Sequence, residues 1–397
     1  MKNINVGDRK MKNSMIKMFN EIYGERENLR VFFSPGRVNL IGEHTDYNGG
    51  NVFPCALSFG TYGAISLRDD KTVRMYSDNF KDLGIISFNI DELVNDEKHD
   101  WANYPKGVID VLRKHGYDVN CGFDMVVFGN IPNGAGLSSS ASLELLMAVM
   151  ANDLFNFNID RVELVKYCQE AENEFIGVNC GIMDQFAIGM GKENSAILLD
   201  CNTLNYTYSP VDLKEEVIII ANTNKRRGLA DSKYNERRSE CETALAELQT
   251  KLNIKSLGEL TEEEFENNKD LIKDEIRVKR ARHAVYENQR TLKAVKALEN
   301  NDIITFGKLM NDSHTSLRDD YEVTGTELDT LVELAWKHEG TIGARMTGAG
   351  FGGCTVSIVK RSLGEDFINT VGKGYKEIIG YDADFYVANI GDGTREI

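Results

Sequence analysis

The chain has 397 residues, of which 42% are hydrophobic and 27% charged, and its formal net charge is −16 at pH 7. This length exceeds what one hydrophobic core usually serves, so it predicts a folded protein of two domains or of one large bilobal unit. The acidic balance argues against nucleic acid or an anionic membrane surface as the main partner. Any bound polyphosphate must then be held by local dipoles, a metal ion and a few placed cations.

No apolar run approaches the roughly 18 to 20 residues of a transmembrane helix, and the first residues lack the apolar core of a signal peptide. The seven cysteines are scattered without a C-x-x-C pair, which favours reduced thiols. The six histidines are also dispersed, so a transition-metal enzyme is not indicated. We therefore expect a cytoplasmic protein with no nucleic-acid, membrane or obligate protein partner.

The first half of the chain mixes helical and strand patterns. Apolar residues at helical spacing predict a helix over residues 14–24. A β-prone run at 30–34 is followed by Pro35 and Gly36, so we expect the strand to end there and the next segment to begin in or beside a turn. Periodicity and turn residues predict the other elements of this half: strands over 52–57, 63–67, 72–77, 83–88 and 123–128, and helices over 101–115, 143–155, 162–176 and 184–190.

The second half of the chain is more helical. A polar, turn-rich segment near residue 206 is where we place the domain boundary, which gives domains 1–205 and 206–397. Composition and periodicity predict the elements around and after it: strands over 195–200, 217–222 and 355–359, helices between 234 and about 300, and a further helix over 328–337.

A loop of glycines and serines, NGAGLSSSAS at residues 133–142, leads into the helix predicted over 143–155. Such a loop leaves several backbone N–H groups pointing one way, and the helix dipole adds positive potential, which suits a phosphate group. The alternative is an ordinary helix start that is capped by a serine. The pattern matches neither G-x-x-x-x-G-K-[ST] nor G-x-G-x-x-G, so it is not a P-loop or a Rossmann fingerprint.

Residues 36–50, GRVNLIGEHTDYNGG, bring together an arginine, two carboxylates, a histidine and several amides between glycines. Recognition of a polyol needs several donors and acceptors at close range, and loops of such mixed polarity are often sites. The alternative is a surface loop in which Asn39 and Asp46 satisfy local backbone groups.

Two acidic residues stand out further along the chain. Glu172 lies in the helix predicted over 162–176, from which it can reach a metal ion. Asp184 follows Ile182 and Met183, so we expect it to be partly buried near the chemistry. The alternative for Asp184 is the N-cap of the next helix.

Residues 343–354, GARMTGAGFGGC, carry five glycines before the strand predicted over 355–359. This density implies turns with positive φ or a close approach of the backbone to another group.

Together these stretches resemble the motifs of a known family. Residues 36–50 look like the galactokinase signature, and the loop at 133–142 resembles the phosphate loop of the GHMP kinases (galactokinase, homoserine, mevalonate and phosphomevalonate kinases). Residues 343–354 resemble that family's third, glycine-rich motif. The resemblance implies an α+β fold of two GHMP-kinase-like domains, with mixed sheets, helices packed against them, and the active site in the cleft between the domains.

The resemblance also implies ATP-dependent phosphorylation of the anomeric hydroxyl of α-D-galactose, with Mg²⁺, giving galactose 1-phosphate and ADP. Asp184 would act at that hydroxyl, as general base or orienting acceptor, and Arg37 would stabilise the developing charge. The implied sugar-binding residues are Glu43, His44, Thr45, Asp46, Gly181 and Tyr234. The implied nucleotide-binding residues are Ser77, Gly134, Ala135, Gly136, Leu137, Ser138, Ser139 and Ser140, with Trp101 near the adenine. The implied Mg²⁺ ligands are Ser140 and Glu172.

Two other functions stay open at this point. One is a kinase for a related sugar such as N-acetylgalactosamine, which needs extra room near the 2-hydroxyl. The other is a non-catalytic sensor of galactose and ATP on the same fold. Sensors of this type resemble galactokinase but have lost small residues of the serine loop, whereas Ser138, Ser139, Ser140 and Ala141 are all present here.

Overall fold

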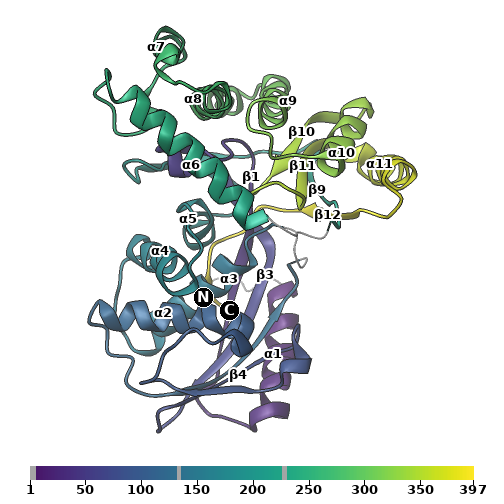
Figure 1. The fold of residues 1–397 in the computed structure, drawn as a ribbon. Helices are drawn as coiled ribbons and strands as arrows, with labels where there is room; N and C mark the ends of the chain where they lie inside the picture. Colours follow the sequence, from purple (N-terminus) through teal and green to yellow (C-terminus); the bar gives the residue numbers. More distant parts are fainter. Residues whose placement is uncertain (1–5, 132–135, 226–229) are drawn as a thin grey trace.

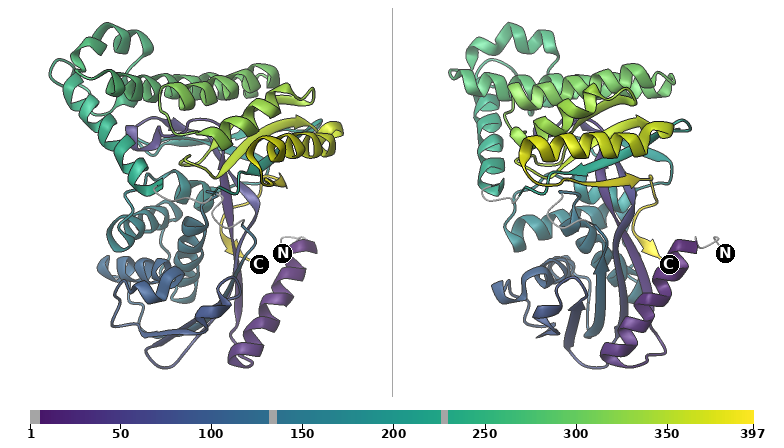
Figure 2. Two further views of the ribbon diagram at one scale, coloured as in Figure 1. Left: turned by 45° about the vertical axis from the view of Figure 1, so that its right-hand side comes forward. Right: turned by 90° about the vertical axis from the view of Figure 1, so that its right-hand side faces the viewer.

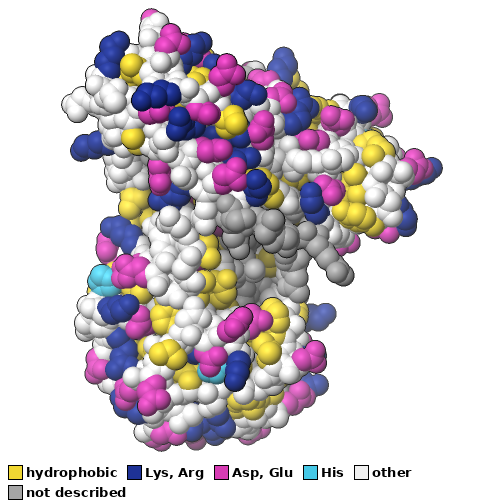
Figure 3. Space-filling view, in the orientation of Figure 1, with side chains coloured by type: hydrophobic (Ala, Val, Ile, Leu, Met, Phe, Trp, Pro, Cys, Tyr) yellow, Lys and Arg dark blue, Asp and Glu magenta, His cyan; other side chains and the backbone are white. Residues whose placement is uncertain are grey.

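The computed structural model describes residues 6–131, 136–225 and 230–397. They form two lobes, of which the lower in Figure 1 comes mainly from the N-terminal half and the upper mainly from the C-terminal half. Charged side chains of both signs are interspersed over both lobes on the face shown in Figure 3. Within these described ranges, no helix combines the length and the apolar character needed to cross a membrane.

A six-stranded sheet forms the centre of the lower lobe. Its neighbouring strands run antiparallel except for one parallel pair, β4 with β6, so the sheet is mixed. The last strand of the chain, β13, returns to pair with the first strand, β1. In spatial order the strands are β13 (Arg395–Glu396), β1 (Arg30–Asn39), β3 (Pro54–Leu67), β6 (Phe123–Gly129), β4 (Thr72–Ser77) and β5 (Ile86–Asn89).

Helices cover both faces of this sheet (Figure 2). Successive side chains of a strand point to opposite faces: Val31 and Phe33 pack with the first helix, whereas Phe32 between them belongs to the core on the other side. One face carries α1 (Val6–Tyr23), and the other carries α2 (Asn103–Lys114), α3 (Ser139–Leu154), α4 (Arg161–Glu170) and α5 (Met183–Met190).

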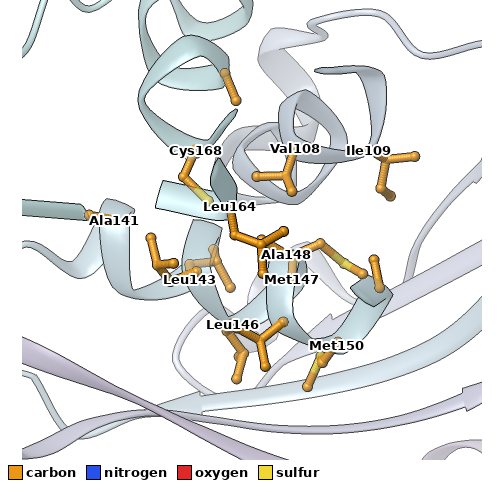
Figure 4. Packing of buried hydrophobic residues seen from close by; sticks show 14 of the residues in the cluster. Val108, Ile109, Ala141, Leu143, Leu146, Met147, Ala148, Met150, Leu164 and Cys168 are labelled. Carbon is orange, nitrogen blue, oxygen red and sulfur yellow. The ribbon is translucent and has the colours of Figure 1, made fainter. Parts of the chain in front are cut away.

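Helix α3 lies in the middle of the larger core. Side chains of α3 such as Leu146 and Met147 meet Val108 of α2 and Leu164 of α4 (Figure 4). The helix is apolar around most of its circumference, which is typical of a helix that is buried on several sides. Its N-terminus, the end of the serine loop, is therefore held rigidly.

An antiparallel four-stranded sheet organises the upper lobe. Its strands in spatial order are β10 (Thr341–Thr347), β11 (Cys354–Lys360), β9 (Glu216–Asn222) and β12 (Asp384–Ala388). Alternate residues of β9 serve two cores: Ile219 packs with α10 and α11, whereas Ile218 and Ile220 pack with α8, α9 and strands of the lower lobe. The helices of this lobe are α6 (Ala230–Leu248), α7 (Glu262–Asn268), α8 (Glu275–Glu299), α9 (Ile303–Asp319), α10 (Thr326–Lys337) and α11 (Gly364–Ile379).

A small third sheet lies where we predicted the domain boundary. It consists of β2 (Asn51–Val52), β7 (Ser195–Asp200) and β8 (Tyr206–Pro210). Because β7 pairs with β8, the strands on either side of residue 205 belong to one sheet. The division into 1–205 and 206–397 stays a prediction.

The α+β class and the mixed sheets are confirmed, but several local expectations were wrong. Residues 54–57 and 63–67, expected in two separate strands, belong to one strand, β3, whereas Val52 belongs to β2. Pro35 and Gly36 do not end β1, which continues to Asn39 through a register shift. Helix α3 begins at Ser139 rather than Leu143, and the helix expected over 162–176 is α4 followed by a π-helical turn, Ala171–Ile176.

Candidate active site between the lobes

Arg37 and Asp184 form the centre of the site. Nε of Arg37 donates to Oδ1 of Asp184 at 2.7 Å and Nη2 donates to Oδ2 at 2.8 Å, while Nη1 donates to the Gly136 carbonyl oxygen at 2.7 Å. Burial lowers the pKa of Arg37, but the charge and hydrogen bonds of Asp184, with the charges of Glu43 and Asp46, together raise it by more, so the guanidinium stays charged. The arginine side chain is 4% exposed and that of Asp184 32%, so the aspartate is the partner that remains accessible.

A bulge in β1 positions Arg37. The register between β1 and β3 shifts between Pro35 and Arg37, and proline, which lacks an N–H, is tolerated at a bulge. A Cβ atom on Gly36 would lie only 3.0 Å from the Leu137 carbonyl oxygen, to which the backbone N–H of Arg37 donates at 3.3 Å. The bulge therefore connects residues 36–50 to the glycine- and serine-rich loop at Leu137.

The two helix-cap alternatives are wrong. Helix α5 begins at Met183 after the N-cap residue Ile182, so Asp184 lies inside its first turn. Ser138 stands at the N-cap of α3 with a left-handed backbone (φ +61°), but its side chain makes no capping bond. Its hydroxyl donates instead to Oδ2 of Asp184. Both side chains therefore bind residues of other elements instead of capping their own helices.

Asp46, Gly181 and Tyr234 lie close to one another near Asp184. A Cβ atom on Gly181 would be 1.8 Å from Oδ2 of Asp46, so the glycine and the carboxylate are packed together. Burial, followed by the charge of Asp184, raises the pKa of Asp46 to about 6. Burial also raises the pKa of Tyr234, and the charges of Asp46 and Asp184 add to this shift, so α6 brings the phenol near both carboxylates.

Glu43 is held by the third motif. It forms a buried ion pair with Arg345, with 2.7 Å between Oε2 and Nη2, and the two side chains are 1% and 0% exposed. The backbone N–H of Gly348 donates to Oε1 of Glu43 at 2.9 Å. Burial raises the pKa of Glu43 despite the opposing effect of Arg345. Its contact with a sugar stays a prediction, because both of its oxygens already have protein partners.

His44 and Thr45 lie deeper than the sequence suggested. His44 is buried with φ +61°, and its Nδ1 lies 2.9 Å from the hydroxyl of Tyr47. Burial, followed by the charge of His283, lowers the pKa of His44 to about 3, so the ring is neutral. Thr45 is 0% exposed, and its hydroxyl donates to the carbonyl oxygens of Gly42 and Asn51. These contacts stabilise the conformation of the loop that contains His44 and Thr45.

Ser140 and Glu172 lie together, as the sequence predicted. The Ser140 hydroxyl donates to Oε1 of Glu172 at 3.1 Å. Neighbouring ligands of an octahedral Mg²⁺ ion with bonds of about 2.1 Å stand about 3.0 Å apart, so the two oxygens fit one ion. Burial, followed by the charge of Asp184, raises the pKa of Glu172 to about 7. Within the described residues no group of three acidic, histidine or cysteine side chains forms a metal site.

A pocket opens beside the start of α3. Its lining includes Ser139 and Ser140 together with Ser77, Trp101 and Tyr104. The predicted phosphate-binding and adenine-binding residues therefore share one cavity. The side chain of Leu137 instead packs in the core between the lobes. The predicted residues Gly134 and Ala135 lie outside the described residues.

The third motif forms the turn between β10 and β11. Gly348, Gly350, Gly352 and Gly353 all have positive φ, which confirms the expectation of left-handed turns. A Cβ atom on Gly348 would lie 3.0 Å from the Gly136 carbonyl oxygen. The motif therefore packs against the serine loop as well as against Glu43.

Two arginines near predicted site residues, Arg345 and Arg238, were not predicted from the sequence. Arg345 lies within the third motif, where the glycines drew attention instead. Arg238 on α6 donates through Nη1 to the backbone and side-chain oxygens of Asn179 at 2.9 and 3.0 Å. Because Tyr234 and Arg238 are four residues apart on a helix, they share a face, and this spacing was the available signal.

Comparisons with known proteins agree with this geometry. Family models match at residues 17–67 (galactokinase galactose-binding signature), 103–192 (GHMP kinases N terminal domain) and 294–377 (GHMP kinases C terminal). The chain is 66% identical to a galactokinase of Clostridium beijerinckii, covering 100% of both chains, and 57% identical to one of Bacillus subtilis, covering 98% of this chain and 99% of that protein.

Solved structures give the same result. Lactococcus lactis galactokinase complexed with galactose superposes with a TM-score of 0.96 at 53% identity, covering 98% of this chain and 100% of that one. Methanococcus jannaschii mevalonate kinase superposes with a TM-score of 0.66 at 19% identity, covering 93% and 100%, and supports the fold alone. This chain therefore belongs to the galactokinase family of the GHMP kinases.

Proposed function

We propose that this chain transfers the γ-phosphoryl group of ATP to the anomeric hydroxyl of α-D-galactose. The observation that carries this proposal is the set of groups gathered around Asp184, which is paired with Arg37. After burial, the charge of Asp184 contributes to the raised pKa values of Asp46, Tyr234 and Glu172, so all three lie near it. Because Glu172 binds Ser140, which lines the pocket, this arrangement supports a sugar at Asp46 and Tyr234 and a nucleotide at the pocket.

Catalysis in this arrangement consists of positioning and charge stabilisation. Phosphoryl transfer passes through a loose transition state in which little covalent chemistry falls to the protein. Asp184 accepts the hydrogen bond of the anomeric hydroxyl and receives its proton as the new O–P bond forms and the bond from the γ-phosphorus to the β,γ-bridging oxygen breaks, which releases ADP. Arg37 holds this carboxylate in a bidentate pair and places positive charge near the transferred group.

The nucleotide side requires further positive charge because the whole chain is acidic. Ser139 and Ser140 begin α3, whose N-terminal N–H groups and dipole favour phosphate oxygens. Ser140 and Glu172 would hold a Mg²⁺ ion, which neutralises phosphate charge when it is bound. Ser77 and Trp101 line the same pocket and would contact the adenine.

We assign the sugar contacts to Asp46, Tyr234 and the backbone at Gly181, with Glu43 at their edge. His44 and Thr45 act differently from their neighbours: their buried contacts support a role in holding the loop that presents Asp46.

A sugar-dependent ADP-release assay tests the activity. Galactose, N-acetylgalactosamine, glucose and arabinose are compared at saturating Mg·ATP, and galactose is expected to give the highest kcat/KM. Higher kcat/KM with N-acetylgalactosamine would identify the related kinase. Galactose binding without ADP release would identify a sensor.

Gly181→Ala is expected to raise KM for galactose at least about 10-fold, because the added methyl group would displace Asp46. KM for ATP should change little, since neither Gly181 nor Asp46 lines the nucleotide pocket. Gly364→Ala is the matched control, because its nearest neighbour would be 3.5 Å from the new Cβ. An unchanged KM for galactose in Gly181→Ala would remove Asp46 from the sugar site.

Galactose affinity is expected to fall as the pH decreases through about 6. The pKa of Asp46 is raised to about 6, so the carboxylate is ionised and accepts sugar hydroxyls above this pH and becomes protonated below it. The dissociation constant of galactose, measured by calorimetry without nucleotide between pH 5 and 8, should rise at the acidic end. Asp46→Asn should bind weakly and show a flat profile, whereas a titration preserved in that variant would assign it to another group.

A further inference from the structure

A cluster of four polar side chains, Ser140, Glu144, Glu172 and Gln185, is linked by hydrogen bonds behind the site. Ser140 and Glu144 are four residues apart on α3 and so lie on one face of that helix. Glu172 comes from the π-helical turn Ala171–Ile176, and Gln185 comes from α5. Glu144 and Gln185 are both 0% exposed. Neither contributes to the site as described so far.

Hydrogen bonds from Gln185 and Ser140 connect this polar cluster. Nε2 of Gln185 donates to Oε2 of Glu172 at 2.6 Å and to Oε2 of Glu144 at 3.1 Å. The Ser140 hydroxyl donates to the other oxygen of Glu172, Oε1. One oxygen of Glu172 is thus held from inside by an amide, while the other faces the serine that would share a metal ion with it.

This polar cluster lowers the stability of the core. Oε1 of Glu144 and Oε1 of Gln185 have no hydrogen-bond partner among the described residues, and a buried polar atom without a partner destabilises a fold. Apolar side chains of similar size would avoid this cost. Of the four residues in this polar cluster, Ser140 and Glu172 belong to the site. Glu144 and Gln185 can therefore affect function by orienting the carboxylate of Glu172.

From this geometry we propose that Gln185 and Glu144 are positioning residues that orient the carboxylate of Glu172 toward a Mg²⁺ ion bound with the nucleotide. The inference rests on the proposed function, in which Ser140 and Glu172 hold that ion. Gln185 fixes one carboxylate oxygen, and Glu144 fixes the amide of Gln185. Groups that orient a metal ligand in this way commonly change metal affinity 10- to 100-fold when they are removed.

Calorimetric titration of the full chain with ADP, in the presence of Mg²⁺ or of a chelator, tests the proposal. Gln185→Leu and Glu144→Leu are expected to weaken binding of Mg·ADP at least about 10-fold. Binding of metal-free ADP and of galactose should stay within about twofold, a split that general damage to the fold would not produce. Glu144→Gln keeps a carbonyl oxygen for the amide of Gln185 and should lose no more than about threefold. Gln249→Leu is the control, because the side-chain amide of Gln249 donates to the Ile254 carbonyl oxygen at an exposed position.

The outcomes separate this inference from the proposed function. Unchanged Mg·ADP affinity in Ser140→Ala and Glu172→Gln would show that the metal site itself is wrong, and the positioning role would fall with it. If Ser140→Ala and Glu172→Gln weaken Mg·ADP binding but Gln185→Leu binds Mg·ADP with wild-type affinity, only the positioning role is overturned. Equal losses for Mg·ADP and metal-free ADP would also overturn it. If Glu144→Leu does not fold, Gln185→Leu and Glu144→Gln still decide the question.

Discussion

Asp184→Asn is expected to reduce kcat at least about 100-fold, in line with the usual effect of removing a group that accepts a proton in the transition state. The asparagine keeps the size of the side chain but has one acceptor oxygen in place of two and no charge. It therefore neither takes the proton of the anomeric hydroxyl nor forms the bidentate pair with Arg37. Binding of galactose should change much less, because Asp46 and Tyr234 remain.

Steady-state ADP release gives kcat, and calorimetry gives the dissociation constant of galactose for the same protein. Asp110→Asn is the matched control, since Asp110 forms an ion pair with Lys114 on α2 at 2.9 Å, and its turnover should stay within about twofold of wild type. Turnover within about threefold of wild type in Asp184→Asn would remove Asp184 from the mechanism.

Arg345→Met is expected to lower the free energy of unfolding by about 3–5 kcal/mol, because it leaves the carboxylate of Glu43 buried without its ion-pair partner. The variant also removes the bonds from Arg345 to the Asn39 carbonyl oxygen at 2.9 Å and to the Ser313 hydroxyl at 3.2 Å. These bonds join β10 to β1 and to α9, so the loss affects the junction of the two lobes.

Urea denaturation followed by circular dichroism measures this change. Arg318→Met is the control, since the side chain is 34% exposed and pairs with the exposed Asp319, and exposed pairs contribute about 0–1 kcal/mol. The double variant Glu43→Gln/Arg345→Met should be more stable than Arg345→Met, because the unpaired charge is gone. A loss below about 1 kcal/mol in Arg345→Met would contradict the importance of this pair for stability.

Most helices and strands were predictable because their apolar residues recur with the local period of the element. The strands over 72–77 and 195–200 were predicted with the bounds that the structure has. Helix α9 was missed because its buried face includes Ser313 and His314, which weaken the apolar pattern. Helix α11 was missed because Gly372 and Gly374 lower its helix propensity.

The end of β1 was misjudged for a different reason. Pro35 and Gly36 are usually turn residues, and nothing local shows that a bulge accommodates them. That bulge depends on the neighbouring strand β3, where Gly60 leaves room for the backbone at Ser34: a Cβ atom on Gly60 would lie 2.0 Å from the Ser34 carbonyl oxygen.

By itself, the sequence determined the chemistry that is available. Its three motifs supply a guanidinium, carboxylates, hydroxyls and left-handed glycine turns. Residue types of this kind can be identified without a structure. Only the tertiary structure decided which of these groups meet. Arg37 and Asp184 are 147 positions apart, and Thr45, which lies beside Asp46 in the chain, is turned into the loop's own backbone. The reason is physical: local propensity and periodicity act over a few residues, whereas such contacts depend on how the sheets and helices of both lobes pack.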